Sequence, residues 1–176
     1  SIFAMSSVLK TPTPEYYIDM KGVQAVTYPD QRWLRCDIKA ITLLANLLAR
    51  QHAIDENVHE SIFIRDGFAT EGSATNLFIV KEKKVITSPK NHLILGGITR
   101  DLVIEILRAH NVTVEEKPIS LSDLKIADEI WLTSSTKEIM PVTRVDQHWV
   151  NEGRMGNLWL KASRWFKEFI QALNSE

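Results

Sequence analysis

Three features that often reveal a protein's class are scarce in this sequence of 176 residues. It has a single cysteine, Cys36, so it cannot form an intrachain disulfide. It has no apolar run that approaches the roughly 20 residues needed to cross a bilayer. Its formal net charge is −1, which leaves no basic excess for a nucleic acid or an anionic membrane. These absences predict a cytoplasmic protein with no nucleic-acid partner and no membrane partner.

Several common chemical motifs are also absent. Neither a P-loop nor a dinucleotide-binding fingerprint occurs. The five histidines lack paired helical spacing and Cys36 has no cysteine partner, so we expect no metal site. A serine or cysteine nucleophile with a local histidine is not indicated, which makes hydrolase chemistry a poor candidate.

The length and the hydrophobic content of 44% suit one domain with an ordinary core. Residues 11–14 read Thr-Pro-Thr-Pro, and prolines of this kind are typical of a linker. We therefore expect residues 1–14 to be a tag remnant or an interdomain link, and residues 15–176 to form the domain. The first residue is not methionine, which fits either a tag or a start within a longer protein.

Strand-like and helix-like patterns alternate along the rest of the chain, which predicts a mixed α/β or α+β fold. Asp37 is suited to cap a helix that runs to Ala53, with Lys39 in its first turn. Thr99 is suited to cap the helix at residues 100–110, and residues 120–123 have capping-box spacing. The aromatic residues of the terminal helix, near residues 158–173, are expected in the core. The predicted strands are residues 22–28, 61–65, 77–80, 85–88, 112–119, 129–133 and 142–145.

Two polar clusters lie where anions often bind. Residues 96–99, Gly-Gly-Ile-Thr, precede a helix, whose first backbone N–H groups and dipole favour a phosphate. Residues 133–136, Thr-Ser-Ser-Thr, follow a strand. Alone, each cluster is more often a cap or a polar turn. In the same way, Lys39 alone is more often a solvated lysine and Glu71 a loop acid.

Four segments together resemble one family. They are residues 32–39 (Arg-Trp-Leu-Arg-Cys-Asp-Ile-Lys), 70–78 (Thr-Glu-Gly-Ser-Ala-Thr-Asn-Leu-Phe), 93–100 (Leu-Ile-Leu-Gly-Gly-Ile-Thr-Arg) and 132–139 (Leu-Thr-Ser-Ser-Thr-Lys-Glu-Ile). In order and spacing they are similar to the fold-type IV (class IV) aminotransferases, which use pyridoxal 5'-phosphate. The first segment points to the D-amino-acid (D-alanine) aminotransferase branch. The resemblance runs from about Gly22 to the end of the chain and implies the C-terminal pseudo-barrel domain, mostly β-strands with flanking helices.

The resemblance implies roles for particular residues. Lys39 would be the catalytic lysine that forms a Schiff base with the cofactor and then moves the substrate's proton. A lysine suits both tasks because its pKa falls readily on burial. Glu71 would face the pyridine nitrogen and keep it protonated, so that the ring accepts electrons. Arg32 would contact the cofactor's phenolic oxygen.

The remaining residues of the site would surround the cofactor. Leu95 would pack against one face of its ring. Ser73 and Asn76 would support Glu71 and Lys39 from behind. Ala74 replaces the hydroxyl residue that the pattern leads us to expect. The phosphate cup would consist of Ile98, Thr99, Ser134 and Ser135.

The implied activity is transfer of an amino group between a D-amino acid such as D-alanine and a 2-oxo acid such as 2-oxoglutarate, by a homodimer. Members of the family also carry a large N-terminal domain that closes the active site, and no segment here matches it. Two alternatives stay open. One is another fold-type IV enzyme, either a branched-chain aminotransferase or an aminodeoxychorismate lyase. The other is an inactive truncated module.

Overall fold

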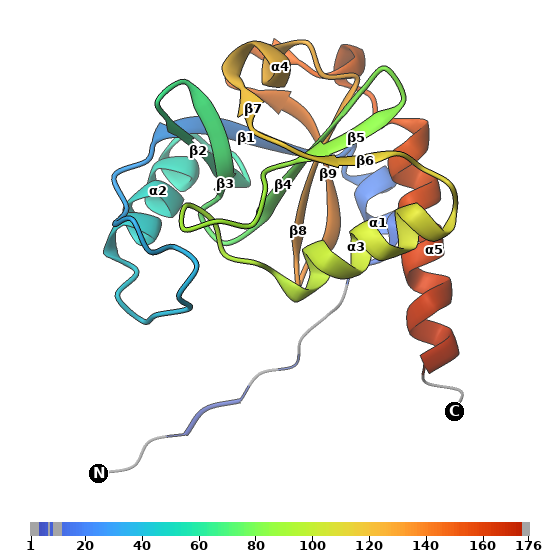
Figure 1. Ribbon diagram of the computed structural model, residues 1–176, viewed down its shortest axis with the longest axis horizontal. Helices are drawn as coiled ribbons and strands as arrows, with labels where there is room; N and C mark the ends of the chain where they lie inside the picture. Colours follow the sequence, from blue (N-terminus) through green and yellow to red (C-terminus); the bar gives the residue numbers. More distant parts are fainter. Residues whose placement is uncertain (1–3, 7, 9–11, 174–176) are drawn as a thin grey trace.

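The structure, a computed structural model, describes residues 4–6, 8 and 12–173 (Figure 1). These residues form one mixed sheet of ten strands with helices on its outside. The helices are α1 (Pro14–Asp19), α2 (Leu44–Asp55), α3 (Ile98–Ala109), α4 (Leu121–Lys125) and α5 (Asn157–Leu173), with a 3₁₀ turn at Asn151–Gly153. The strands are β1 (Val23–Pro29), β2 (Glu60–Arg65), β3 (Phe68–Gly72), β4 (Asn76–Lys81), β5 (Lys84–Thr87), β6 (Val114–Glu116), β7 (Ile119–Ser120), β8 (Glu129–Ser134), β9 (Glu138–Val145) and β10 (His148–Trp149).

The sheet is curled, and its strand order is β6-β5-β4-β8-β9-β1-β2-β3-β7, with β10 paired to β9. Strand β1 runs parallel to both β2 and β9, whereas β4 is antiparallel to β5 and β8. This confirms the predicted mixed α/β fold with mostly β-strands and flanking helices.

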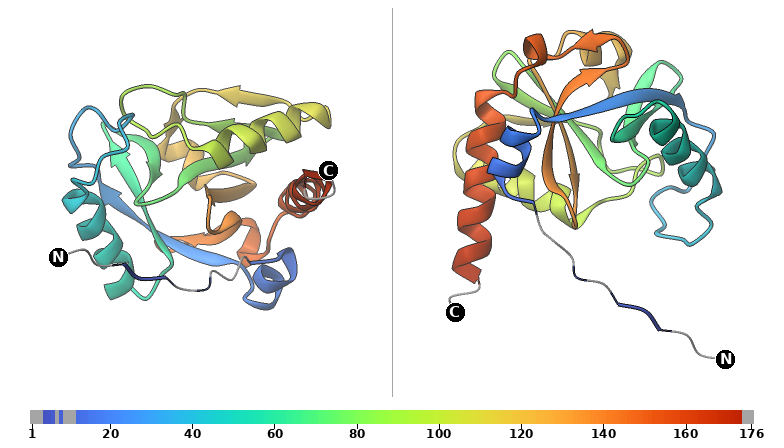
Figure 2. Two further views of the ribbon diagram at one scale, coloured as in Figure 1. Left: turned by 90° about the horizontal axis from the view of Figure 1, so that it is seen from below. Right: turned by 180° about the vertical axis from the view of Figure 1, so that it is seen from behind.

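The core lies between the sheet and two helices. Helices α3 and α5 contact each other and β8, and Figure 2 shows them on the same side of the molecule. Helix α2 instead contacts β2 and β1, away from that pair. The largest fully buried side chains include Trp131, Trp159 and Phe78. No helix in the described part of the chain is long and apolar enough to cross a membrane.

The predicted helix from Asp37 is wrong in its first part, because α2 begins only at Leu44. Residues 37–43 belong to a loop, so Lys39 is not in a helical turn. Asp37 does not cap a helix; its carboxylate accepts hydrogen bonds from Arg35 at 3.0 and 2.9 Å. The apolar residues that suggested the early start, Ile38 and Ile41, are exposed, so no core contact holds them in a helix.

Three other expectations need correction. Helix α3 begins at Ile98 with Gly97 as its N-cap, so Thr99 lies inside the helix. The single strand expected at residues 112–119 is two strands, β6 and β7, because Pro118 between them has no N–H to donate. Phe169 of the terminal helix is 40% exposed and not in the core.

Some elements were not predicted, and β3, which carries Glu71, is the most important of these. Helix α1 begins at Pro14, the residue where we expected the link to end, and Thr13 caps it. Residues 1–3, 7 and 9–11 of the expected 1–14 segment lie outside the described residues. The capping box at residues 120–123 is confirmed, since the Asp123 N–H donates to the Ser120 hydroxyl at 3.0 Å.

Candidate functional site

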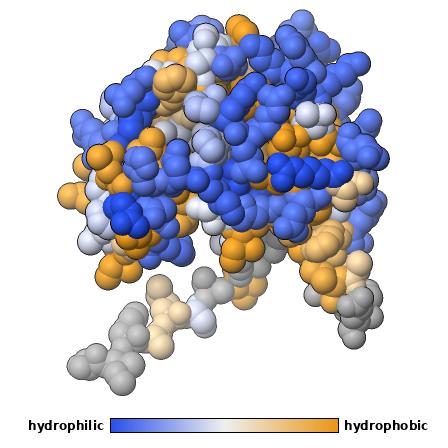
Figure 3. Space-filling model, in the orientation of Figure 1, coloured by the Kyte–Doolittle hydropathy of each residue, from blue (hydrophilic) through white to orange (hydrophobic). Residues whose placement is uncertain are grey.

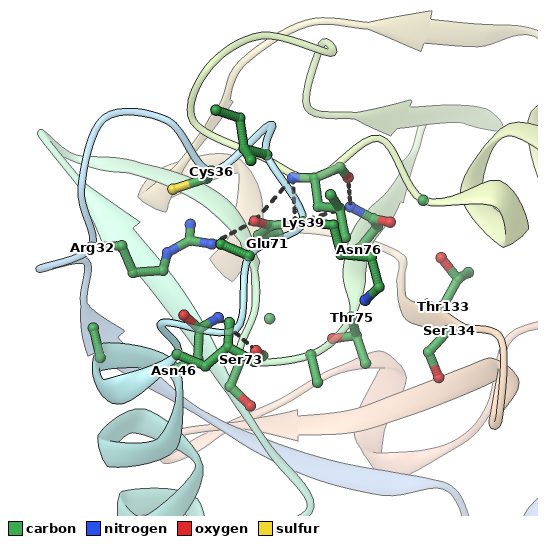
Figure 4. A pocket seen from close by; sticks show the side chains of 18 of the residues that line it. Arg32, Cys36, Lys39, Asn46, Glu71, Ser73, Thr75, Asn76, Thr133 and Ser134 are labelled. Carbon is green, nitrogen blue, oxygen red and sulfur yellow. Dashed lines mark hydrogen bonds and ion pairs between the residues drawn. The ribbon is translucent and has the colours of Figure 1, made fainter.

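A cavity of about 480 Å³ opens where four segments meet (Figure 4). These segments are the loop before α2 (residues 30–43), the β3–β4 turn (residues 72–75), the start of α3 and the end of β8. Every site residue predicted from the sequence lines this cavity: Arg32, Lys39, Glu71, Ser73, Asn76, Leu95, Ile98, Thr99, Ser134 and Ser135. Segments distant in the sequence therefore converge on one site.

Glu71 lies near the end of β3 and is 5% exposed. The guanidinium of Arg32 donates from Nη1 to Glu71 Oε1 at 2.5 Å. The side-chain amide of Asn76 donates to Glu71 Oε2 at 3.1 Å. The Leu95 N–H donates to the same carboxylate at 3.1 and 3.2 Å. Three elements thus fix the orientation of this acid.

Arg32 is itself held from behind by Asp30, a residue that was not predicted to belong to the site. The two side chains form a bidentate ion pair, with both N···O distances at 2.9 Å. Arg65 also contacts Asp30, at 3.0 Å, and the Arg32 guanidinium lies 4.2 Å from the centre of the Phe63 ring. Since the Asp30 side chain is fully buried, Arg32 is an anchored cation and not a mobile one.

The three charges of this network influence one another. Burial raises the pKa of Glu71 to about 7, even though Arg32 and the Leu95 N–H lower it. Burial also opposes ionisation of Asp30, but hydrogen bonds from Arg32 and Arg65 outweigh it, and the pKa of Asp30 lies below its ordinary value. The pKa of Arg32 is raised, because its two carboxylate partners outweigh its burial. Glu71 is therefore the acid of the site that titrates near neutral pH.

Lys39 enters the same cavity from the loop before α2 and is exposed. Within the described residues, its amine has no hydrogen-bond or ion-pair partner. Figure 4 shows it among the labelled side chains of the cavity wall. An amine without a partner that lines the same cavity as a buried acid is free to react with a ligand.

The other end of the cavity is rich in hydroxyl groups and backbone donors. Thr99 belongs to the first turn of α3, whose leading N–H groups lack helical partners. Ser134 and Ser135 approach from the end of β8. A Cβ at Gly97 would lie 2.2 Å from Asn76 Oδ1, so only glycine allows α3 to start so close to β4. An anion fits this end of the cavity.

Several residues of the cavity wall were not predicted from the sequence. Thr133 is the clearest, because its hydroxyl is buried and has no hydrogen-bond partner in the described structure. It belongs to the polar cluster at residues 133–136, and that cluster was the feature of the sequence that could have predicted it. Cys36 also lines the cavity, and burial raises the pKa of its thiol. Thr75 stands inside the segment 70–78 that resembles the family, whereas Asn46 lies outside the four segments and the sequence offered no signal for it beyond its polarity.

Ser73 and Asn76 were both expected to support Glu71 and Lys39, but of these two only Asn76 forms a hydrogen bond with Glu71 within the described residues. Asn76 does contact Glu71, and it also donates to the Leu95 carbonyl at 2.7 Å. The Ser73 hydroxyl, by contrast, donates to Glu60, a buried acid of β2 behind the cavity. No group of three or more metal-ligating side chains occurs among the described residues.

Comparisons with known proteins give the same family. Residues 2–145 match the aminotransferase class IV family. The chain is 42% identical over 137 residues to D-alanine aminotransferase of Bacillus licheniformis, covering 78% of this chain and 48% of that protein. It is 39% identical over 151 residues to D-alanine aminotransferase of Listeria monocytogenes, covering 86% and 52%. The chain thus spans about half the length of these curated relatives.

Solved structures agree on the fold. The branched-chain amino acid aminotransferase of Escherichia coli superposes with a TM-score of 0.75 at 30% identity, over 84% of this chain and 52% of that one. An aminotransferase from Brucella abortus bound to pyridoxal phosphate gives a TM-score of 0.76 at 26% identity, over 85% and 54%. Because the family match covers most of the sequence, this chain belongs to the class IV aminotransferases.

Proposed function

We propose that the protein containing this chain is a pyridoxal-phosphate-dependent aminotransferase that exchanges an amino group between a D-amino acid such as D-alanine and a 2-oxo acid such as 2-oxoglutarate. The observation that carries the proposal is the presence, in one cavity, of the unpartnered Lys39 amine and the buried Glu71 carboxylate. The D-alanine aminotransferase relatives support the D-amino-acid branch.

The residues present fit pyridoxal phosphate. A volume of about 480 Å³ is within the range of small-molecule sites. The cavity offers an amine, a carboxylate and a phosphate-compatible helix start in separate places. The buried Thr133 hydroxyl, which lacks a partner, indicates that the wall is built for polar contacts that a ligand would complete. When bound, the cofactor supplies an electron sink for the substrate's α-carbon.

Each residue then has a definite task. Lys39 would be the covalent attachment point of the cofactor, and its amine would take the proton from the substrate's α-carbon and deliver it to the cofactor. Glu71 binds the ring nitrogen and stabilises its protonated form, while Asn76 and Leu95 keep the carboxylate in place. Arg32 lies beside the ring and can donate to its phenolic oxygen.

The phosphate end completes the binding site. We assign the phosphate to the backbone N–H groups of Ile98 and Thr99 and to the hydroxyls of Thr99, Ser134 and Ser135. The Leu95 side chain, which lines the cavity, would pack against one face of the ring. These contacts orient the cofactor without taking part in proton transfer.

A coupled assay tests the activity. The protein is loaded with pyridoxal phosphate and given D-alanine with and without 2-oxoglutarate, and pyruvate is measured. We expect repeated turnover only with the acceptor, because without it D-alanine can yield at most one pyruvate per bound cofactor, and we expect no pyruvate from Lys39→Ala. Lys161→Ala, an exposed lysine of α5 away from the cavity, is the matched control and should retain activity. Without the acceptor, more pyruvate than bound cofactor would contradict amino-group transfer.

A branched-chain aminotransferase is the second candidate, since the structural relatives carry that name. L-leucine and D-alanine offered separately with 2-oxoglutarate distinguish the two. Preference for L-leucine would replace the D-amino-acid assignment while leaving the roles of Lys39 and Glu71 unchanged.

The assembly of the protein is also a proposal. We propose that residues 15–176 are the C-terminal cofactor-binding domain, that residues 1–14 are a tag or link, and that the full-length protein is a cytoplasmic homodimer. Apolar side chains gather on the surface at α2 and the loop before it (Figure 3), and such clusters mark contact surfaces. They include Ile41, Leu44, Leu47 and Leu48. The isolated chain, about half the length of its relatives, is expected to be inactive or weakly active.

A further inference from the structure

A buried acid lies directly behind the floor of the cavity. Glu60, the first residue of β2, is 3% exposed and is not part of the cavity wall. Within the described residues it forms no ion pair. Buried carboxylates are usually paired with a cation, because an isolated buried charge costs much free energy. The structure therefore has to satisfy this carboxylate in another way.

Hydrogen bonds from one turn do so. The turn consists of residues 72–75 and is called the floor turn below. Glu60 Oε1 accepts from the Ser73 N–H at 3.3 Å and from the Ser73 hydroxyl. Glu60 Oε2 accepts from the Thr75 hydroxyl at 3.3 Å. The Ser61 N–H supplies a further bond to Oε1, at 2.9 Å.

The fit between Glu60 and the floor turn is close. A Cβ at Gly72 would lie 2.0 Å from Thr75 Oγ1 and 3.1 Å from Glu60 Cγ. The turn is also closed by a bond from the Gly72 N–H to the Thr75 carbonyl at 2.7 Å. The side-chain amide of Asn46 donates a hydrogen bond to the Ser73 carbonyl of the turn at 2.8 Å. Small shifts of Glu60 would therefore move the turn.

The floor turn connects the two residues that define the ring end of the cavity. Glu71 precedes it and Asn76 follows it, and all four of its residues line the cavity. We infer that Glu60 is a positioning residue, which sets the floor turn and thereby holds Glu71 and Asn76 in the geometry that binds the cofactor ring. The inference rests on the proposed function, because it assumes that pyridoxal phosphate occupies the cavity.

Glu129 provides a matched control. It is also a buried acid, 9% exposed, and it accepts hydrogen bonds from the Leu158 N–H at 2.9 Å, the Trp159 N–H at 2.8 Å and the Trp131 indole at 2.9 Å. It holds the start of α5 and does not line the cavity. Loss of either acid should destabilise the fold, but only loss of Glu60 should affect the cavity.

The test compares Glu60→Leu, Glu60→Gln and Glu129→Leu in this chain. Unfolding in urea measures stability without cofactor. Absorbance titration measures the dissociation constant of pyridoxal phosphate and the pH midpoint of the bound cofactor's spectrum. We expect both leucine variants to be less stable. Only Glu60→Leu should weaken cofactor binding, by about tenfold, and shift the midpoint. Glu60→Gln should retain both values, because a glutamine can satisfy the same partners.

The inference is overturned if folded Glu60→Leu has the affinity and midpoint of the original protein, or if Glu129→Leu changes them equally. If Glu60→Leu does not fold, a second variant, measured against Thr75→Ser because Thr75 also lines the cavity, is Thr75→Val, which removes the hydroxyl contact to Oε2. That variant should weaken binding and shift the midpoint in the same direction, and unchanged values would again overturn the inference. Failure of the unaltered chain to bind pyridoxal phosphate would refute the proposed function itself.

Discussion

The raised pKa of Glu71 makes a prediction about stability without cofactor. Burial moves this pKa from the ordinary value of 4.5 to about 7. Between these values the folded protein binds more protons than the unfolded chain. Stability due to this group is therefore fully present below the unfolded pKa and is lost as pH rises through the folded pKa. Replacing Glu71 with glutamine removes the group and its pH dependence.

The size of the effect follows from the shift. One pKa unit corresponds to about 1.4 kcal/mol, so the full effect is about 3 kcal/mol, and about 2.5 kcal/mol of it falls between about pH 5 and pH 8. Glu71 is almost completely buried, so solvent screening reduces this little. The free energy of unfolding of Glu71→Gln minus that of the unaltered chain should therefore rise by about 2.5 kcal/mol between about pH 5 and pH 8.

Urea unfolding of both proteins across this pH range, followed by circular dichroism, measures the difference. Other titrating groups are shared by the two proteins, and their contributions cancel. A relative loss of stability in Glu71→Gln as pH rises would mean that the ion pair with Arg32 outweighs burial. That result would refute the reasoning about this acid.

Three further predictions concern neighbouring residues. Thr133→Val should raise the free energy of unfolding by up to about 1 kcal/mol, because it removes an unpaired buried hydroxyl, yet it should weaken cofactor binding in titrations. Ser163→Ala, which removes a similar hydroxyl outside this cavity, should leave binding unchanged. Asp30→Asn should cost about 3 kcal/mol in urea unfolding, since it leaves a buried guanidinium poorly paired, whereas the exposed Asp37→Asn should leave the free energy of unfolding nearly unchanged. Lys39→Ala should change the stability of the cofactor-free protein by less than about 0.5 kcal/mol, because its amine has no partner; a larger change in the same unfolding assay would contradict that.

The sequence predicted the fold class because most strands and the two long amphipathic helices carry clear periodicity. It failed where tertiary contacts decide. The apolar spacing around Ile38 and Ile41 is helical, but these side chains are exposed and the chain there forms the loop that carries Lys39. Strand β3 was not predicted because it is short and directly follows the turn at Asp66-Gly67. Glu71 was therefore interpreted as a loop residue.

The site was predicted through motifs and not through periodicity. The resemblance of four segments to the class IV aminotransferases predicted that Lys39, Glu71 and the phosphate-end residues belong to the site. All of them line one cavity. The supporting acids were not found. Asp30 contacts Arg65 and Glu60 contacts Ser73, and contacts between residues so far apart in the sequence leave no local pattern in it. Their importance becomes visible only from burial and hydrogen-bond partners.

The most direct test of the account is where pyridoxal phosphate attaches. The chain is incubated with the cofactor, treated with borohydride to make the attachment permanent, digested and mapped by mass spectrometry. The account predicts that the cofactor's mass is found on the peptide containing Lys39, and that Lys39→Ala carries none. Attachment mainly at another lysine, or none after saturation with cofactor, would contradict it.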